Sequence, residues 1–109
     1  KSMTIIGHIG KLSKLSIGVF NTHSKICDGR MEAFVYYLAL RGASIELLDR
    51  INICITAEEA LGCCIEAGYG KIAGDMARGC KDRIRKYLKD ESYPVEVIIF
   101  SMERGVFMG

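Results

Sequence analysis

Two neighbouring segments near the start of the chain hold the residues best suited to chemistry. The first is Gly7-His8-Ile9-Gly10-Lys11, with Lys14 three residues further on. Glycines let backbone amides face a ligand, and the N-terminus of a following helix favours anions. The two lysines add positive charge at the same end, so this segment is a candidate site for a phosphate or a carboxylate. A plain strand-to-helix turn, with His8 as a hydrogen-bonded histidine, is the alternative interpretation.

The second segment is Thr22-His23-Ser24, which precedes Cys27 and Asp28. His23 titrates near neutral pH and could act as an acid or a base. His23 and Cys27 together would make only half of a zinc site, because no second pair stands at ligand spacing. Asp28 is also suited to cap a helix that starts just after it.

Other motifs are absent or weak. A phosphate-binding P-loop is excluded, because Ile5 stands in place of its first glycine and Leu12 in place of its hydroxyl residue. The spacing of Gly7 and Gly10 does not supply a dinucleotide fingerprint. The basic stretch 81–86 contains an aspartate and is interpreted as the solvated face of an amphipathic helix rather than as a nucleic-acid patch.

The composition is that of one small globular domain. The chain has 109 residues, of which 50% are hydrophobic and 26% charged, with a net charge of +2. These values exclude a disordered tail, and no apolar run reaches the roughly 20 residues that a membrane helix needs. The five cysteines form neither a CxxC pair nor an even set, so we expect reduced thiols in a cytoplasmic protein. The chain opens directly into a predicted strand, from which we expect a fragment whose N-terminal part has been removed.

The elements that must position these residues follow from hydrophobic spacing and capping residues. The pattern predicts an α/β fold with a small mixed sheet packed by about four helices. Thr56 and Glu59 form a capping box, Ser44 is a helix cap and Gly42 is a helix stop. The apolar run Val95–Phe100 predicts a strand that is covered on both faces. The predicted strands are 3–6, 95–100 and 106–108, and the predicted helices are 12–20, 29–41, 44–51, 56–68 and 70–89.

The joined pattern from Gly7 to Glu32 strongly resembles a known family. It reads GHIGKLSKLSIGVFNTHSKICDGRME, and it is similar to the C-terminal part of the cobalt-precorrin-5B C1-methyltransferases, the CbiD family. The resemblance is strong up to Glu32 and looser over the rest of the chain. It implies that residues 1–109 are the C-terminal α/β domain, Rossmann-like in form, of a larger two-domain protein whose N-terminal domain is absent.

The resemblance also implies a function. The intact protein would transfer a methyl group from S-adenosylmethionine to carbon 1 of a cobalt-containing tetrapyrrole during anaerobic cobalamin synthesis. It would be cytoplasmic, with no nucleic-acid or membrane partner and no metal of its own, and a homo-oligomer is a candidate assembly. We expect the isolated fragment not to turn over. A non-catalytic ligand- or partner-binding module is the alternative function, and a zinc- or nucleic-acid-binding domain is a weaker one.

The resemblance, together with the residue types, gives a candidate site. Positively charged groups would hold the carboxylates of the substrate, because arginine can bind a carboxylate with two hydrogen bonds. Acidic groups would face the sulfonium or the ribose of the donor. The candidate catalytic residues are His23 and Asp28, and the candidate binding residues are Gly7, His8, Gly10, Lys11, Lys14, Thr22, Ser24, Arg30 and Glu32.

Overall fold

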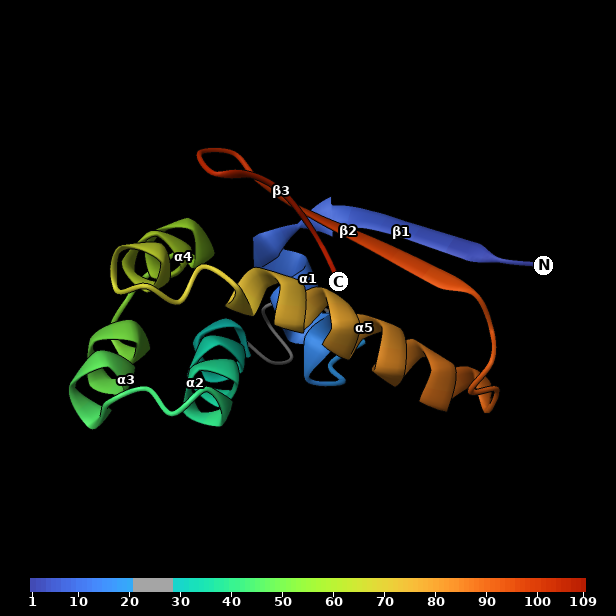
Figure 1. The fold of residues 1–109 in the computed structure, drawn as a ribbon, viewed down its shortest axis with the longest axis horizontal. Coiled ribbons are helices and arrows are strands. Elements are labelled where there is room, and N and C mark those ends of the chain that lie inside the picture. The colour runs from blue at the N-terminus through green and yellow to red at the C-terminus, as the bar shows by residue number, and fades with distance from the viewer. Residues whose placement is uncertain (21–28) are drawn as a thin grey trace.

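The computed structural model describes residues 1–20 and 29–109. The described chain forms a three-stranded sheet and five helices, so the predicted α/β class is confirmed. Each of the five predicted helical segments overlaps one of these helices, although the summary of about four helices was one too low. The elements are β1 (Met3–His8), α1 (Ile9–Ser16), α2 (Arg30–Leu40), α3 (Ile45–Asn52), α4 (Ala57–Glu66), α5 (Ile72–Leu88), β2 (Val95–Ser101) and β3 (Gly105–Met108). Figure 1 shows their arrangement.

The sheet is mixed, as predicted. Strand β1 pairs in parallel with β2, in a register that runs from Met3 opposite Val95 to His8 opposite Phe100. Strand β3 pairs antiparallel with β2 through a short hairpin. Parallel neighbours require a long crossover, and the segment between β1 and β2, which contains all five helices, supplies it. The carboxyl ends of β1 and β2 therefore lie at the same edge of the sheet.

The helices cover one face of this sheet (Figure 1). Val95, Val97 and Ile99 point into the core, where α5 and α1 pack against the strands. Glu96 is exposed, and Ile98 is only partly buried. The prediction that this strand is covered on both faces is thus wrong for the described residues, because every described helix lies on the inner side.

The start of the first helix differs from the prediction. Strand β1 continues through Gly7 and His8, and α1 begins directly at Ile9 with no intervening turn. The reason is an unusual cap: the Nδ1 atom of His8 accepts a hydrogen bond from the Gly10 amide at 3.0 Å. Gly10 and Lys11 therefore belong to the first turn of the helix. The helix also ends at Ser16, earlier than the expected Phe20.

The locally encoded caps are confirmed. The hydroxyl of Thr56 accepts from the Glu59 amide at 3.1 Å, and the Glu59 carboxylate reaches back to the Ile55 amide at 3.0 Å. Ser44 caps α3 in the same way, and Gly42 follows α2 with φ +79°. The cap position of α2 falls on Gly29 rather than on Asp28, which lies outside the described residues.

A close contact fixes α1 against α2 and α5. The hydroxyl of Tyr37 on α2 donates to the Ser16 carbonyl at the end of α1, at 2.8 Å. It passes over Gly79 of α5, where a Cβ atom would lie 1.8 Å from the tyrosine oxygen. Glycine is therefore required at this position for the three helices to approach one another. This packing holds α1, and with it the lysines of the candidate site, against the sheet.

Candidate functional site

A cavity of about 580 Å³ lies where β1 ends and three helices begin. The helices α1, α2 and α4 each contribute residues of their N-terminal ends to its lining, so their dipoles favour an anion there. Open α/β sheets commonly bind ligands at the carboxyl ends of their strands, where this cavity lies. Its lining comprises His8, Gly10, Lys11, Lys14, Arg30, Thr56, Ala57 and Glu58.

Five of the predicted binding residues meet at this cavity. His8, Gly10 and Lys11 come from the β1–α1 junction, Lys14 from the next turn of α1, and Arg30 from the start of α2. The side chain of Lys14 is buried, whereas that of Lys11 is exposed. Three cations face one carboxylate across the cavity lining, which suits an anionic ligand.

Glu58 is the residue that the sequence analysis missed. Its carboxylate accepts three hydrogen bonds: from His8 Nε2 at 2.6 Å, from Ser101 Oγ at 2.5 Å and from the Met102 amide at 2.7 Å. Burial alone would raise the pKa of Glu58, but the hydrogen bonds from Ser101, Met102 and His8 outweigh it and hold the pKa below its ordinary value. This ionised side chain joins α4 to the ends of β1 and β2. Only its place in the first turn of a capped helix could have drawn attention to it.

The imidazole of His8 is fully engaged. Because Nδ1 accepts from the Gly10 amide, the ring proton of the neutral form lies on Nε2, which donates to Glu58. The ring also contacts Phe100 edge-on, with centroids 5.5 Å apart. The alternative interpretation of His8 as a hydrogen-bonded core histidine is therefore confirmed for the hydrogen bonds only, because the side chain is half-buried at the edge of the core. This histidine shapes the cavity and caps α1, and in this state it offers no free nitrogen to act as a base.

The remaining predicted residues lie elsewhere or outside the described chain. Gly7 lies one residue before the end of β1, where a Cβ atom would lie 3.1 Å from Leu12 Cγ, so it permits close packing of α1 on the strand. Glu32 lies in the first turn of α2 and does not line the cavity. Five further predicted residues lie outside the described part of the chain: Thr22, His23, Ser24, Cys27 and Asp28.

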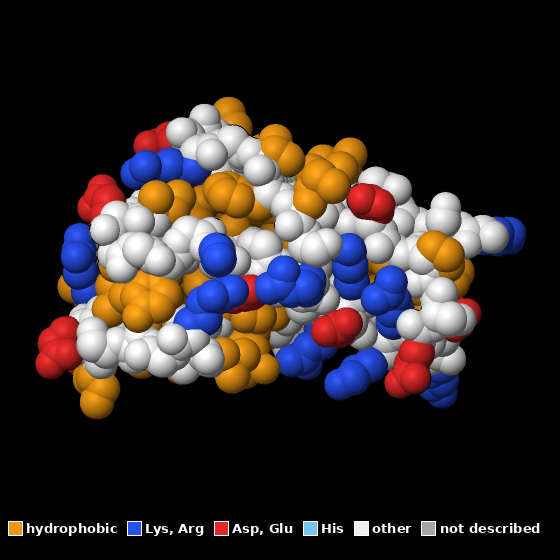
Figure 2. Space-filling view, in the orientation of Figure 1, with side chains coloured by type: hydrophobic (Ala, Val, Ile, Leu, Met, Phe, Trp, Pro, Cys, Tyr) orange, Lys and Arg blue, Asp and Glu red, His pale blue; other side chains and the backbone are white. Residues whose placement is uncertain are grey.

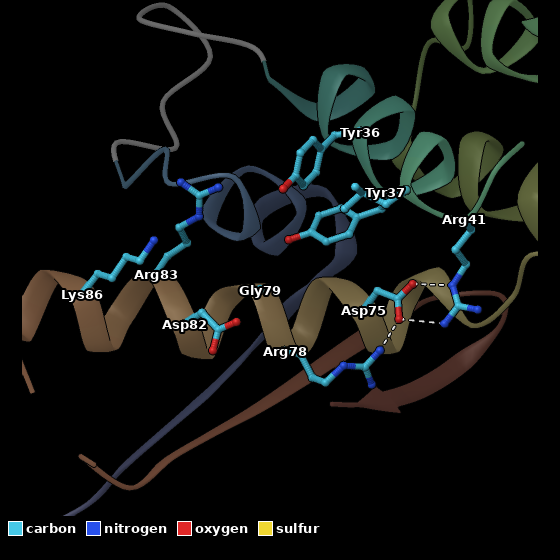
Figure 3. A pocket seen from close by; sticks show the side chains of 10 residues that line it. Tyr36, Tyr37, Arg41, Asp75, Arg78, Gly79, Asp82, Arg83 and Lys86 are labelled. Atoms are coloured by element: carbon cyan, nitrogen blue, oxygen red, sulfur yellow. Dashed lines mark hydrogen bonds and ion pairs between the residues drawn. The ribbon is translucent and has the colours of Figure 1, made fainter. Parts of the chain in front are cut away.

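A larger cavity, of about 700 Å³, lies between α2 and α5 (Figure 3). Its most prominent charges are already paired, because Asp75 binds both Arg41, at 2.5 and 2.9 Å, and Arg78. Figure 2 shows further Lys and Arg side chains spread along the same face, over α5. The amphipathic interpretation of this helix holds, since Ile84 is buried whereas Asp82 and Lys86 are exposed. We therefore take the smaller cavity, where helix N-termini converge, as the candidate site.

None of the described helices is long and apolar enough to cross a membrane. Within residues 1–20 and 29–109, no three His, Cys, Asp or Glu side chains are grouped so that they could hold a metal ion.

Comparison with known proteins identifies the family. The family profile described as "CbiD, C-terminal domain" matches residues 21–108, which is most of the chain. The chain belongs to the CbiD family. The resemblance inferred from residues 7–32 is thus confirmed, and the profile extends it across the helices and the closing strands. No solved structure matches the chain significantly.

Curated relatives share one name, "Cobalt-precorrin-5B C(1)-methyltransferase". The relative from Alkaliphilus oremlandii is 67% identical over 109 residues, which are 100% of this chain and 30% of the relative. The relative from Treponema denticola is 51% identical over 106 residues, 97% of this chain and 29% of its own length. The relative from Clostridioides difficile is 44% identical over 108 residues, 97% of this chain and 26% of its own. The CbiD chain studied here therefore spans about 30% of the length of these relatives.

Proposed function

We propose that this CbiD chain is the C-terminal part of an enzyme of anaerobic cobalamin (vitamin B12) synthesis. The enzyme transfers a methyl group from S-adenosylmethionine to C1 of cobalt-precorrin-5B and gives cobalt-precorrin-6A. The observation that carries the proposal is the 67% identity, over the whole chain, to a relative with that name. We further propose a cytoplasmic, two-domain protein, of which this chain is the Rossmann-like C-terminal part.

The rate of this reaction depends mainly on how the methyl donor and the acceptor carbon are positioned. The bond between sulfur and the methyl group breaks, its electron pair stays on sulfur as a neutral thioether, and a new bond forms between the methyl group and the nucleophilic C1. Such a transfer needs little acid–base help, so holding the two reactants in line dominates. The acetate and propionate groups of the substrate are suitable ligands for Lys11, Lys14 and Arg30, which line the cavity.

The donor is proposed to use the same cavity. The N-termini of α1 and α4 and the exposed Lys11 suit the carboxylate of its methionine part. Glu58 is not available to the sulfonium, since its carboxylate already accepts three hydrogen bonds. His23 and Asp28 stay proposed catalytic residues, and the proposed binding residues outside this cavity are Gly7, Thr22, Ser24 and Glu32.

A hybrid enzyme tests this function. The 109 residues replace the matching segment of the Alkaliphilus relative, and methyl transfer from labelled S-adenosylmethionine to cobalt-precorrin-5B is measured. We expect Lys11→Ala to lower kcat/KM by about 10- to 100-fold, because the substitution removes one charge-assisted hydrogen bond to the ligand. Lys71→Ala, at the start of α5 and outside this cavity, is the matched control and should have little effect.

Two outcomes would contradict the proposal in different ways. A hybrid that makes no methylated product, beside an active relative, would refute the function. Unchanged kinetics in both Lys11→Ala and His23→Ala would remove these residues from the site while leaving the function intact. Calorimetry of the isolated chain with S-adenosylmethionine addresses the alternative of a non-catalytic binding module. No binding is expected if the cleft needs the rest of the enzyme, whereas binding would show that this chain holds the donor by itself.

A further inference from the structure

One face of the sheet carries apolar side chains that no described element covers. We define the open sheet face as two rows that follow the strand register. The first row is Ile6, Ile98 and Met108, and the second is Phe100 and Val106. His8 borders the second row on β1, but its ring already binds Glu58 of α4. Ile6 and Val106 are each 65% exposed, and Met108 is 57% exposed. In Figure 2, hydrophobic side chains gather along the edge of the molecule where Figure 1 places the strands.

The strand pairing makes this exposure unusual. Parallel strands such as β1 and β2 are normally covered on both faces, whereas antiparallel strands often leave one face to water. A water-facing surface would also show polar residues at alternate positions. Here Ile98 and Phe100 occupy those positions on β2, and the continuous apolar run 95–100 fits a strand with two covered faces.

Strand β1 also lies at an edge of the sheet. The sheet order is β1-β2-β3, so β1 has one neighbour and presents a free backbone edge among the described residues. Proteins usually protect such edges with charges, proline or a covering segment, because exposed edges pair with other chains. The sequence of β1 is Met-Thr-Ile-Ile-Gly-His, which contains neither proline nor a lysine or acidic residue.

We propose that the open sheet face is the surface on which the rest of the longer CbiD polypeptide packs. The occupant is the part of the protein that corresponds to the roughly 70% of the Alkaliphilus relative outside the match, since the chain covers 30% of it. With strands about 4.8 Å apart and a rise of about 3.3 Å per residue, the three strands and two rows measure roughly 14 Å by 13 Å. That area accommodates one packed helix, whose diameter with side chains is about 10–12 Å.

The side chains of the open sheet face favour an apolar occupant. Glu96 is the charged residue on this side of β2, and it lies at the far end from His8, opposite Thr4. The two rows themselves hold no lysine, arginine or acidic residue. A nucleic acid or another highly charged partner has no counter-charge here, whereas an apolar helix or strand face of the same polypeptide does not need one. This inference does not depend on the methyl-transfer reaction.

Methionine oxidation offers a direct test. Hydrogen peroxide converts exposed methionine to its sulfoxide, and peptide mass spectrometry gives the rate at each position. Met108 is measured in the isolated chain and in the hybrid with the Alkaliphilus relative, with Met102 as the reference. Met102 is 79% exposed at the β2–β3 turn and lies outside the two rows. We expect oxidation of Met108, but not of Met102, to slow in the hybrid by on the order of tenfold, because opening must precede reaction.

Paired variants add a second readout. Ile6→Thr/Val106→Thr keeps β-branched residues in the strands while placing two hydroxyls on the face. We expect no loss of Tm in the isolated chain and a fall of about 4 °C or more in the hybrid. The control is Ile53→Thr/Ile55→Thr, in the connection between α3 and α4, where both residues are 79% exposed. This control should leave both proteins unchanged.

The remaining outcomes overturn the proposal. Equal oxidation of Met108 in the chain and the hybrid would mean that the face stays open in the longer protein. Protection in the isolated chain that grows with protein concentration would assign the face to a second copy instead. Because the oxidation measurement uses the unsubstituted hybrid, it decides the question even if the threonine variants fail to fold.

Discussion

At the scale of single residues, Glu58 organises the candidate site. Its carboxylate joins the first turn of α4 to His8 at the end of β1 and to Ser101 at the end of β2. His8 in turn caps α1 through the Gly10 amide. One ionised side chain therefore fixes the relative positions of two strand ends and two helix N-termini. The cavity owes its shape to this cluster, and the lysines and the arginine around it supply its charge.

The substitution Glu58→Gln should destabilise the protein by about 1–3 kcal/mol. The amide NH₂ of glutamine would face a hydrogen-bond donor, which leaves at least one polar group without an acceptor. Glu66→Gln, on the same helix, is the control: Glu66 is exposed and lies 3.9 Å from its nearest cation, so a change below about 0.5 kcal/mol is expected. Urea unfolding of both variants measures the difference, and equal midpoints would show that the Glu58 cluster is not important for stability.

At the scale of elements, Gly79 decides how closely three helices pack. In an exposed helix, replacing glycine by alanine is favourable by roughly 1 kcal/mol. At Gly79 the added methyl group would meet the Tyr37 hydroxyl at 1.8 Å and the Ser16 carbonyl at 3.1 Å. Overpacking of this kind usually costs about 1–3 kcal/mol. We therefore expect Gly79→Ala to lower stability, which thermal unfolding monitored by circular dichroism would measure.

Gly74 of α5 provides the matched control for this prediction. A Cβ atom there would meet the Met108 carbonyl at 3.4 Å, an ordinary contact, so Gly74→Ala should be neutral or stabilising. The double variant Gly79→Ala/Tyr37→Phe should cost less than the sum of its single variants, because the clashing oxygen has been removed. Additive effects would show that the tyrosine hydroxyl is not the source of the strain.

At the scale of the whole molecule, two carboxylates form hydrogen bonds between elements that are distant in sequence, and these bonds make the stability depend on pH. The hydrogen bond from Arg41 is the main cause that holds the pKa of Asp75 below its ordinary value, against the effect of burial. The pKa of Glu58 is lowered as well, by hydrogen bonds that outweigh burial. Asp75 joins α2 to α5, and Glu58 joins α4 to the sheet. Both bonds thus hold the crossover helices in place.

Because the pKa values of Glu58 and Asp75 are lowered in the folded protein, acid should destabilise it. The stabilisation by both groups is complete above their ordinary pKa values near 4, and it is lost as the pH falls through the lower values of the folded state. We expect the urea midpoint to be nearly constant from pH 7 to about 5 and to fall below about 4. The double variant Glu58→Gln/Asp75→Asn should start less stable and show a shallower fall, and an unchanged acid slope would contradict this assignment.

The sequence by itself determined whatever depends on neighbours in the chain. Ser44, Thr56 and Glu59 cap helices within four residues of themselves, so their spacing was sufficient to predict them. The short apolar runs and the helical spacing of hydrophobic residues predicted the strands, the helices and their α/β order. Glycines and lysines beside a strand end are also a local signal, and they predicted the candidate anion site, which stays a prediction; the motif 7–32 indicated the family.

The tertiary structure alone decided the partners that are remote in sequence. Glu58 meets His8 across 50 positions and Ser101 across 43, and no local pattern encodes such pairings. The cap on α1 was missed for the same reason, because His8 is an unusual cap whose ring is held in place by that distant carboxylate. The sequence did not predict the open sheet face either. The apolar run 95–100 indicates that both faces of β2 are suited to burial. Only the packing of the chain determines which of the two faces the helices cover.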